Sequence, residues 1–219
     1  MPRPFDPDPD PDPDALAAFR AAPGFMPEDE GLALYRAAAT VAPLGPLVEV
    51  GSYRGRSTIL LAAAARTAGT HVVTIDHHRG SEEHQPGWEY HDPDLVDPAV
   101  GRVDTLPSFR HTIATSGLED HVIAIVARSE DVGRYWRHGA GLVFVDGSHT
   151  DESAQRDYAA WAEHVVVGGL LAIHDVFADP TEGGQAPYRI YRRALESGRF
   201  TEVAGCRSLR LLRREAHDD

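Results

Sequence analysis

Apolar and polar residues follow two different periods along most of the chain. Short runs rich in Val, Ile and Leu predict seven strands, at residues 45–52, 71–78, 121–129, 141–149, 168–177, 199–205 and 207–215. Longer segments between them have the spacing of helices, at residues 55–69, 106–118, 151–166 and 186–198. Continuous apolar runs are typical of strands buried on both faces of a parallel sheet. The pattern therefore predicts a doubly wound α/β fold: a mostly parallel seven-stranded sheet with an antiparallel C-terminal strand and helices on both faces.

Three segments differ from this alternating pattern. Residues 1–14 alternate Asp with Pro, which predicts a disordered, extended tail because Pro removes amide donors and like charges repel. Residues 15–44 predict two leading helices that a Pro-Gly pair separates. The main domain then covers residues 45–219 and contains a long polar insertion at 77–104.

The insertion is rich in histidine and aromatic residues. Among them are His77, His78, His84, His91, Trp88 and Tyr90. Long loops in compact domains are usually lids or disordered segments, and the aromatic residues favour a lid that shapes a pocket. A zinc site is the weaker interpretation, because the histidine spacing is irregular and the insertion contains no cysteine.

The ends of the first two predicted strands indicate a cofactor site, since ligands bind outside the carboxyl ends of the strands in such sheets. Glu49 closes the first strand, Gly51 and Gly55 bracket a tight loop, and Ser57 begins the next helix. Asp76 ends the second strand, where a carboxylate can accept both hydroxyls of a ribose. The spacing E-x-G-x-x-x-G differs from the dinucleotide motif G-x-G-x-x-G, and a carboxylate at the loop disfavours a pyrophosphate. A positively charged nucleoside cofactor fits this loop better.

The fourth and fifth predicted strands end in residues that can carry charge or bind metal. Asp146 and His149 follow the fourth strand, and His174 and Asp175 end the fifth. Neighbouring strands lie about 4.8 Å apart, so these side chains are expected to converge on one small volume. Asp146, His174 and Asp175 then form a candidate site for a divalent cation. The alternative is a metal-free proton relay, in which His149 or His174 is the general base and Asp146 or Asp175 orients it.

The acid-and-glycine loop, together with the acid after the second strand, resembles the class I S-adenosylmethionine-dependent methyltransferases, which share a Rossmann-like fold. S-adenosylmethionine carries a sulfonium and an ammonium and no phosphate, which agrees with a carboxylate at the loop. In that family the first loop holds the methionine part, and the acid after the second strand holds the ribose. The resemblance implies cofactor-binding roles for Glu49, Gly51, Ser52, Gly55, Ser57, Asp76, His77, Ser129 and Asp146.

Residues 146–176 resemble one branch of this superfamily, whose members methylate hydroxyls of small molecules and sugars. The shared motifs are a D-G-x-H entry, a helix containing Asp and Trp, a Gly-Gly turn and a polar pair at the end of the fifth strand. They correspond here to Asp146, Gly147, His149, Asp157, Trp161, Gly168, Gly169, His174 and Asp175. The resemblance implies O-methylation, and the convergence of the strand ends makes Asp146, His149 and His174 the candidate catalytic residues.

The polar pair His174-Asp175 departs from the pattern of the magnesium-dependent members of this branch. Those enzymes generally carry two acids, or Asp-Asn, at this position. Imidazole is a better ligand for manganese, iron, zinc or nickel than for magnesium. The sequence therefore leaves open whether a metal takes part, and a metal-free imidazole base remains the alternative.

Charge and composition narrow the class of partner. The net charge of -13 works against nucleic-acid binding and against an anionic membrane surface. The single cysteine, Cys206, and an N-terminus without the pattern of a signal peptide favour a cytoplasmic location. The expected partner is a small-molecule hydroxyl acceptor, and the leading helices could build a homodimer contact.

Two other functions compete with methyl transfer. A nicotinamide-dependent oxidoreductase would share the fold, but Glu49 and the missing third glycine of the dinucleotide motif disfavour it. A non-catalytic nucleoside-binding protein of the same fold would keep the cofactor pocket alone. Asp146, His149, His174 and Asp175 argue against it, because pure binding does not require them.

Overall fold

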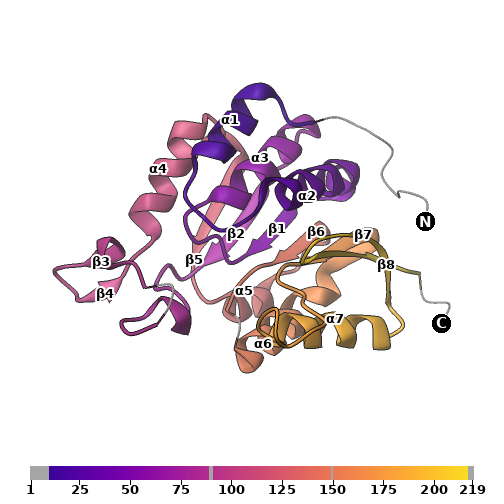
Figure 1. Cartoon of the computed structure of the whole chain (residues 1–219). Coiled ribbons are helices and arrows are strands. Elements are labelled where there is room, and N and C mark those ends of the chain that lie inside the picture. The colour runs from indigo at the N-terminus through magenta and orange to yellow at the C-terminus, as the bar shows by residue number, and fades with distance from the viewer. Residues whose placement is uncertain (1–9, 89–90, 149, 217–219) are drawn as a thin grey trace.

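The computed structural model describes residues 10–88, 91–148 and 150–216, and a seven-stranded sheet forms its centre (Figure 1). The strand order is β5-β2-β1-β6-β7-β9-β8. β9 is antiparallel to both β7 and β8, whereas the other neighbouring pairs are parallel. The strands are β1 (Leu47–Val50), β2 (Val72–Asp76), β5 (Val122–Val126), β6 (Ala140–Val145), β7 (Val165–Ile173), β8 (Phe200–Cys206) and β9 (Leu209–Arg214). This arrangement confirms the fold that the sequence predicts.

Helices cover both faces of the sheet (Figure 1). One layer contains α1 (Pro13–Ala21), α2 (Glu28–Val41), α3 (Arg56–Thr67) and α4 (Leu106–Ser116). The other contains α5 (Ser129–Tyr135), α6 (Asp151–Trp161) and α7 (Ala186–Glu196). Successive strand residues point to opposite faces, so Leu47 packs in the first layer and Val48 in the second.

The leading helices share the main hydrophobic core. Phe19 of α1 and Leu34 of α2 are fully buried in the same cluster as the first face of the sheet. α1 begins at Pro13, and the Asp12 side chain caps it by accepting hydrogen bonds from two backbone amides. Asp10 pairs with Arg36 of α2 at 2.5 Å. The prediction of a disordered tail over residues 1–14 is therefore wrong for residues 10–14, and residues 1–9 lie outside the described part of the chain.

The insertion at 77–104 contains short elements. They are the 3₁₀ turns η2 (Glu82–His84) and η3 (Pro93–Leu95) and the antiparallel strands β3 (Val96–Asp97) and β4 (Arg102–Val103). His78 is buried, with its Nδ1 atom 2.8 Å from the Thr105 hydroxyl oxygen. Tyr90, one of the aromatic residues that suggested a lid, lies outside the described residues. The lid stays a prediction.

Three local features differ from the sequence pattern. The strand predicted at 121–129 ends at Val126, and a short helix, α5, begins at Ser129. β5 forms one edge of the sheet, so Ile123 and Val126 are about half exposed, at 47% and 54%, and not buried on both faces. The helix predicted at 151–166 ends at Trp161, and β7 begins within that segment, at Val165. The other elements agree with their predicted segments to within a few residues.

The sheet topology places a crevice beside β1. The chain runs from β1 to β2 and β5 on one side and then returns to β6 on the other, so the strand order reverses between β1 and β6. Ligands of open α/β sheets bind at this reversal point. Within the described residues, no helix is long and apolar enough to cross a membrane.

Candidate active site

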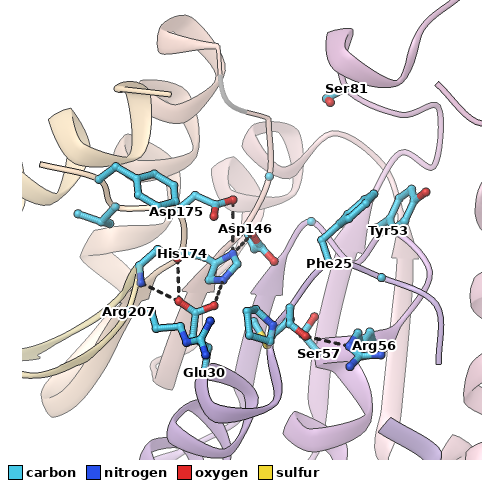
Figure 2. A pocket seen from close by; sticks show the side chains of 18 of the residues that line it. Phe25, Glu30, Tyr53, Arg56, Ser57, Ser81, Asp146, His174, Asp175 and Arg207 are labelled. Atoms are coloured by element: carbon cyan, nitrogen blue, oxygen red, sulfur yellow. Dashed lines mark hydrogen bonds and ion pairs between the residues drawn. The ribbon is translucent and has the colours of Figure 1, made fainter. Parts of the chain in front are cut away.

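A cavity of about 760 Å³ opens at the carboxyl ends of the strands, beside the reversal point (Figure 2). The α1–α2 loop, the β1–α3 loop, the ends of β6 and β7, and the β8–β9 turn surround it. A smaller hollow of about 110 Å³ adjoins it, between the ends of β2 and β5 and the start of α6. The residues that line both are Gly51, Tyr53, Ser81, His84, Asp146 and Gly147. The two spaces therefore form one continuous site.

The β1–α3 loop packs directly against the end of β6. Gly51 has a φ of +87°, and a Cβ atom there would lie 2.3 Å from the backbone oxygen of Asp146. The position therefore requires glycine. The Asp76 carboxylate accepts hydrogen bonds from the amides of Ser52 and Tyr53, at 3.1 and 2.9 Å, and so holds the loop across the edge of the sheet. The buried Ser52 hydroxyl has no hydrogen-bond partner among the described residues, which leaves a polar group for a ligand.

Glu49 lies beneath this loop and lines neither space. Its side chain is fully buried and accepts hydrogen bonds from the hydroxyls of Ser57 and Thr58, both at 2.6 Å. Burial raises the pKa of the Glu49 carboxyl to about 7, although the hydroxyl donors favour the ionised form. The Glu49 carboxyl joins β1 to the start of α3, and its predicted contact with the cofactor stays a prediction. Ser57 itself lines the cavity, whereas Gly55 has a φ of +90° and packs on α4.

The smaller hollow contains the remaining predicted cofactor residues. Asp76, His77 and Ser129 line it, as do Glu130 and Asp157. The Ser129 hydroxyl donates a hydrogen bond to the Asp157 carboxylate. Burial raises the pKa of Asp157 to about 6, although the Ser129 hydroxyl opposes this shift, and the charge of nearby Glu130 adds to it. The structure thus brings the ends of β2, β5 and β6 and the helix α6 together around one space.

His174 lies among three carboxylates at the floor of the main cavity (Figure 2). Its Nδ1 atom is 3.0 Å from Asp146 Oδ1 and 3.5 Å from Asp175 Oδ2, and its Nε2 atom is 2.9 Å from Glu30 Oε2. His174 is 6% exposed. Burial opposes the charged ring, but Asp146, Asp175 and Glu30 outweigh burial and raise the pKa of His174 well above its usual value.

The charge state of His174 decides what it can do. An imidazolium has a proton on both nitrogens and no electron pair with which to remove a proton. The structure therefore does not support His174 as the general base. His149, the other predicted base, lies outside the described residues.

Asp146, His174 and Asp175 converge as the sequence predicts. Each offers one ligand atom, and these atoms lie within 4.8 Å of one another. One imidazole nitrogen with two carboxylate oxygens is a donor set for a borderline divalent cation such as manganese, iron or zinc. Nδ1 of His174 faces both carboxylates, so the three residues fit a metal once that nitrogen has lost its proton.

Sequence reasoning missed several residues of the cavity. Glu30 of α2 contacts His174, and Phe25 in the α1–α2 loop stacks on Tyr53 with ring centroids 5.6 Å apart. The β8–β9 turn adds Arg207 and Ser208. No short sequence motif predicts these residues, because they come from the leading helices and the last hairpin. Glu30 is 144 positions from His174 in the sequence.

Solved structures with the same arrangement of elements include several methyltransferases. A methyltransferase from Podospora anserina bound to SAH is 16% identical, with a TM-score of 0.62 over 93% of this chain and 89% of that one. The O-methyltransferase TomG from Streptomyces achromogenes, in complex with SAM, is 18% identical, with a TM-score of 0.59 over 92% and 86%. An O-methyltransferase from Bacillus cereus in complex with SAH is 17% identical, with a TM-score of 0.57 over 90% and 84%. At these identities the likeness establishes the fold.

A protein-family model described as a methyltransferase domain matches residues 48–176. The match runs from β1 through the end of β7 and so includes the lining of the smaller hollow, part of the wall of the main cavity and the Asp146–His174–Asp175 cluster. It covers more than half of the chain. The chain therefore belongs to the methyltransferase-domain family.

Proposed function

We propose that this protein transfers the methyl group of S-adenosylmethionine to a hydroxyl of a small molecule. The observation that carries the proposal is the pair of adjoining spaces at the reversal point of the sheet, with Gly51 and Asp146 at their boundary. The smaller hollow suits a nucleoside. The main cavity ends at the Asp146–His174–Asp175 cluster, which suits the binding of an acceptor oxygen through a metal. The family match and the fold shared with methyltransferases support the same reaction.

The nucleoside half of the cofactor fits the smaller hollow. Asp76 there is a carboxylate at the end of β2 that a ribose can reach, and Ser129 and Asp157 lie where a base would insert. The methionine half would then lie along the β1–α3 loop, where the Ser52 hydroxyl lacks a partner. Because Glu49 is buried below the loop, Asp146 is the carboxylate at this boundary that can offset the positive charge of the cofactor.

The acceptor fits the main cavity between the cluster and an aromatic wall. Phe25 and Tyr53 form that wall, and Figure 2 shows their rings on the side of the cavity away from Asp175. In the transfer, the bond between methyl and sulfur breaks as the bond between methyl and the acceptor oxygen forms. The neutral thioether S-adenosylhomocysteine leaves, and the hydroxyl proton passes to a base. Holding the acceptor oxygen in line with the methyl group is the main task of the protein.

A divalent metal on Asp146, His174 and Asp175 forms part of the proposal. When bound, such an ion lowers the pKa of an acceptor hydroxyl and makes the oxygen nucleophilic at neutral pH. The protein's own residues hold this position: two carboxylates from the ends of β6 and β7, and an imidazole ring that is nearly buried. The metal-free alternative assigns the base to His149, since His174 is held as an imidazolium.

Calorimetry with S-adenosylhomocysteine tests the cofactor assignment. We expect binding at micromolar concentration, and a large loss of affinity in Asp76→Ala. An absence of binding to the unaltered protein, or equal binding by Asp76→Ala, would remove the proposal. Titration with NADH, followed by fluorescence, is the control for an oxidoreductase and is expected to give no saturable signal.

Transfer of an isotope-labelled methyl group to a panel of phenols and sugars tests the reaction itself. Label is expected on a hydroxyl oxygen, with activity lost on chelation and restored by Mn²⁺. Activity that chelation leaves intact would support the metal-free alternative, and a protein that binds the cofactor without transferring label to any acceptor would be a binding protein.

A further inference from the structure

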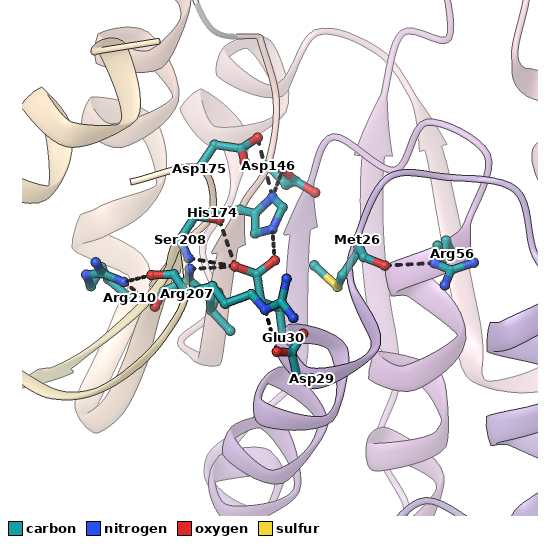
Figure 3. A network of polar contacts seen from close by, with 11 residues as sticks. Met26, Asp29, Glu30, Arg56, Asp146, His174, Asp175, Arg207, Ser208 and Arg210 are labelled. Atoms are coloured by element: carbon teal, nitrogen blue, oxygen red, sulfur yellow. Dashed lines mark hydrogen bonds and ion pairs between the residues drawn. The ribbon is translucent and has the colours of Figure 1, made fainter. Parts of the chain in front are cut away.

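Glu30 connects three segments that are far apart in the sequence (Figure 3). It lies in the first turn of α2 and is 1% exposed. Its Oε1 atom accepts hydrogen bonds from the Ser208 amide at 2.7 Å, the Ser208 hydroxyl at 2.8 Å and the Leu209 amide at 3.2 Å. Its Oε2 atom lies 2.9 Å from Nε2 of His174. A carboxylate is costly to bury unless such donors surround it. These donors therefore compensate for the burial of Glu30 and hold its carboxylate in one orientation.

The two oxygens of Glu30 have different tasks. Oε1 already accepts from three donors of the β8–β9 turn, which fixes the orientation of the carboxylate. Oε2 can only accept, so the His174 nitrogen that it faces must be protonated. Metal binding requires the ring to give up one of its two protons, and a proton kept on Nε2 leaves the electron pair on Nδ1. Nδ1 is the atom that faces Asp146 and Asp175.

We propose that Glu30 is a positioning residue: it holds a proton on Nε2 of His174 and so presents Nδ1 to Asp146 and Asp175 as the ligand atom of the site. The role of Nδ1 as a metal ligand rests on the proposed metal-assisted function, but the protonation of Nε2 can be measured without it. Metal-binding histidines commonly donate their second N–H to a carboxylate, which fixes the ring and its tautomer. Glu30 supplies that carboxylate from outside the part of the chain that carries the methyltransferase match.

Glu30→Gln reverses the proposed tautomer while keeping the shape of the side chain. The three donors of the β8–β9 turn require an oxygen at the position of Oε1, so the amide group of the glutamine must face His174. An amide N–H2 is a donor, and Nε2 would have to accept from it. Nε2 would then lose its proton, whereas Nδ1 would keep the proton that faces Asp146 and Asp175, and that proton would block metal binding. We expect metal affinity to fall about 10- to 100-fold.

Asp29→Asn is the matched control. Asp29 is the neighbouring residue on α2, and the substitution removes the same charge by the same change of oxygen for nitrogen. Its carboxylate pairs with Arg207 and makes no contact with His174 (Figure 3). If Asp29→Asn keeps a metal affinity within about twofold of the unaltered protein, the weaker binding of Glu30→Gln comes from the altered contact with His174 and not from the loss of a negative charge on α2.

The experiment uses the full chain and two readouts. Co²⁺ titration, followed by visible absorption, gives metal affinity, and long-range ¹H–¹⁵N spectra show which nitrogen of His174 carries a proton, with His174→Gln identifying the signal. Supporting results are a protonated Nε2 in the unaltered protein, an unprotonated Nε2 in Glu30→Gln, and loss of Co²⁺ affinity in that variant alone. Circular dichroism checks that each variant is folded.

Two results would overturn the inference. One is an unprotonated Nε2 in the unaltered protein, which needs no variant and so holds even where Glu30→Gln fails to fold. The other is a folded Glu30→Gln that keeps Nε2 protonated and binds Co²⁺ as the unaltered protein does. If the unaltered protein gives no Co²⁺ signal, the metal part of the proposed function fails, and the spectra alone decide the role of Glu30.

Discussion

Two buried glutamates, Glu30 and Glu49, are held by opposite kinds of partner. The carboxyl of Glu49 meets neutral hydroxyls, and burial raises its pKa to about 7. Burial acts in the same direction on Glu30, but the hydrogen bonds from His174 and Ser208 outweigh it and lower its pKa. Both side chains are almost inaccessible to solvent, yet Glu49 is readily protonated and Glu30 is held as a carboxylate, because Glu49 lies deeper in the protein and its donors are neutral.

Glu49 therefore has a structural role, whereas we propose that Glu30 acts on the site through His174. Glu49 can take up a proton without losing its role, because a carboxylic acid still bonds to the hydroxyls of Ser57 and Thr58. Glu30 must stay ionised, because its charge holds the His174 ring and the β8–β9 turn. Substitutions at the two positions should therefore differ in size, in pH dependence and in their effect on metal binding.

The largest effect on stability is expected from Glu30→Ala. The substitution leaves the buried His174 ring without one of its carboxylates and leaves the Ser208 and Leu209 amides without an acceptor. Breaking a buried charge pair on one side costs about 3–5 kcal/mol, and urea unfolding measures the loss. Glu28→Ala, on the same turn of α2 but at the surface beside Arg20, should leave the unfolding midpoint nearly unchanged. Similar midpoints for the two variants would contradict the comparison.

Glu49→Gln should change how stability depends on pH. The pKa of Glu49 is raised from 4.5 to about 7 in the folded state, so its stabilisation is complete below pH 4.5 and is lost as the pH rises towards 7. At about 1.4 kcal/mol for each pKa unit, the unaltered protein should lose about 3 kcal/mol relative to Glu49→Gln across this window.

Urea unfolding of both proteins at several pH values between 4.5 and 8 measures this difference. Parallel stability curves would show that Glu49 does not titrate in this window. The same variant should keep its affinity for S-adenosylhomocysteine within about twofold, because Glu49 lines neither space. A tenfold loss of this affinity would mean that Glu49 contacts the cofactor.

A pair of serine variants gives the smallest effect. Ser208→Ala removes a donor from the ionised Glu30, which should cost about 1.5–3 kcal/mol. Ser57→Ala removes a donor from Glu49, and at pH 6 that carboxyl is mostly neutral, so the cost should be about 0.5–1.5 kcal/mol. Urea unfolding of both variants at pH 6 gives the order. The reverse order would mean that the charge states of the two glutamates are assigned wrongly.

The strand ends show how far local sequence determines the site. Asp146 and His174 follow immediately after β6 and β7, so their side chains are free of the sheet and meet at its edge, as their positions predict. Glu49 lies inside β1, where alternation directs it towards the helix layer that contains α3. The motif predicts the correct loop for Glu49, but the alternation of side chains along β1 directs its carboxyl below that loop.

Other parts of the site were out of reach because their contacts are distant in sequence. Glu30 belongs to an ordinary helical segment, and its partners His174 and Ser208 lie 144 and 178 positions later. The short helix α5 was also missed, since its seven residues are too few to show a helical period. The alternation of strands and helices was predictable because each element carries its own apolar pattern.

A crystal structure with bound S-adenosylhomocysteine tests the central claim most directly. We predict ribose hydroxyls within hydrogen-bond distance of the Asp76 carboxylate, the sulfur atom beside Asp146 and facing His174, and no contact between the ligand and Glu49. A ligand whose ribose lies away from Asp76, or whose amino group reaches Glu49, would contradict the account.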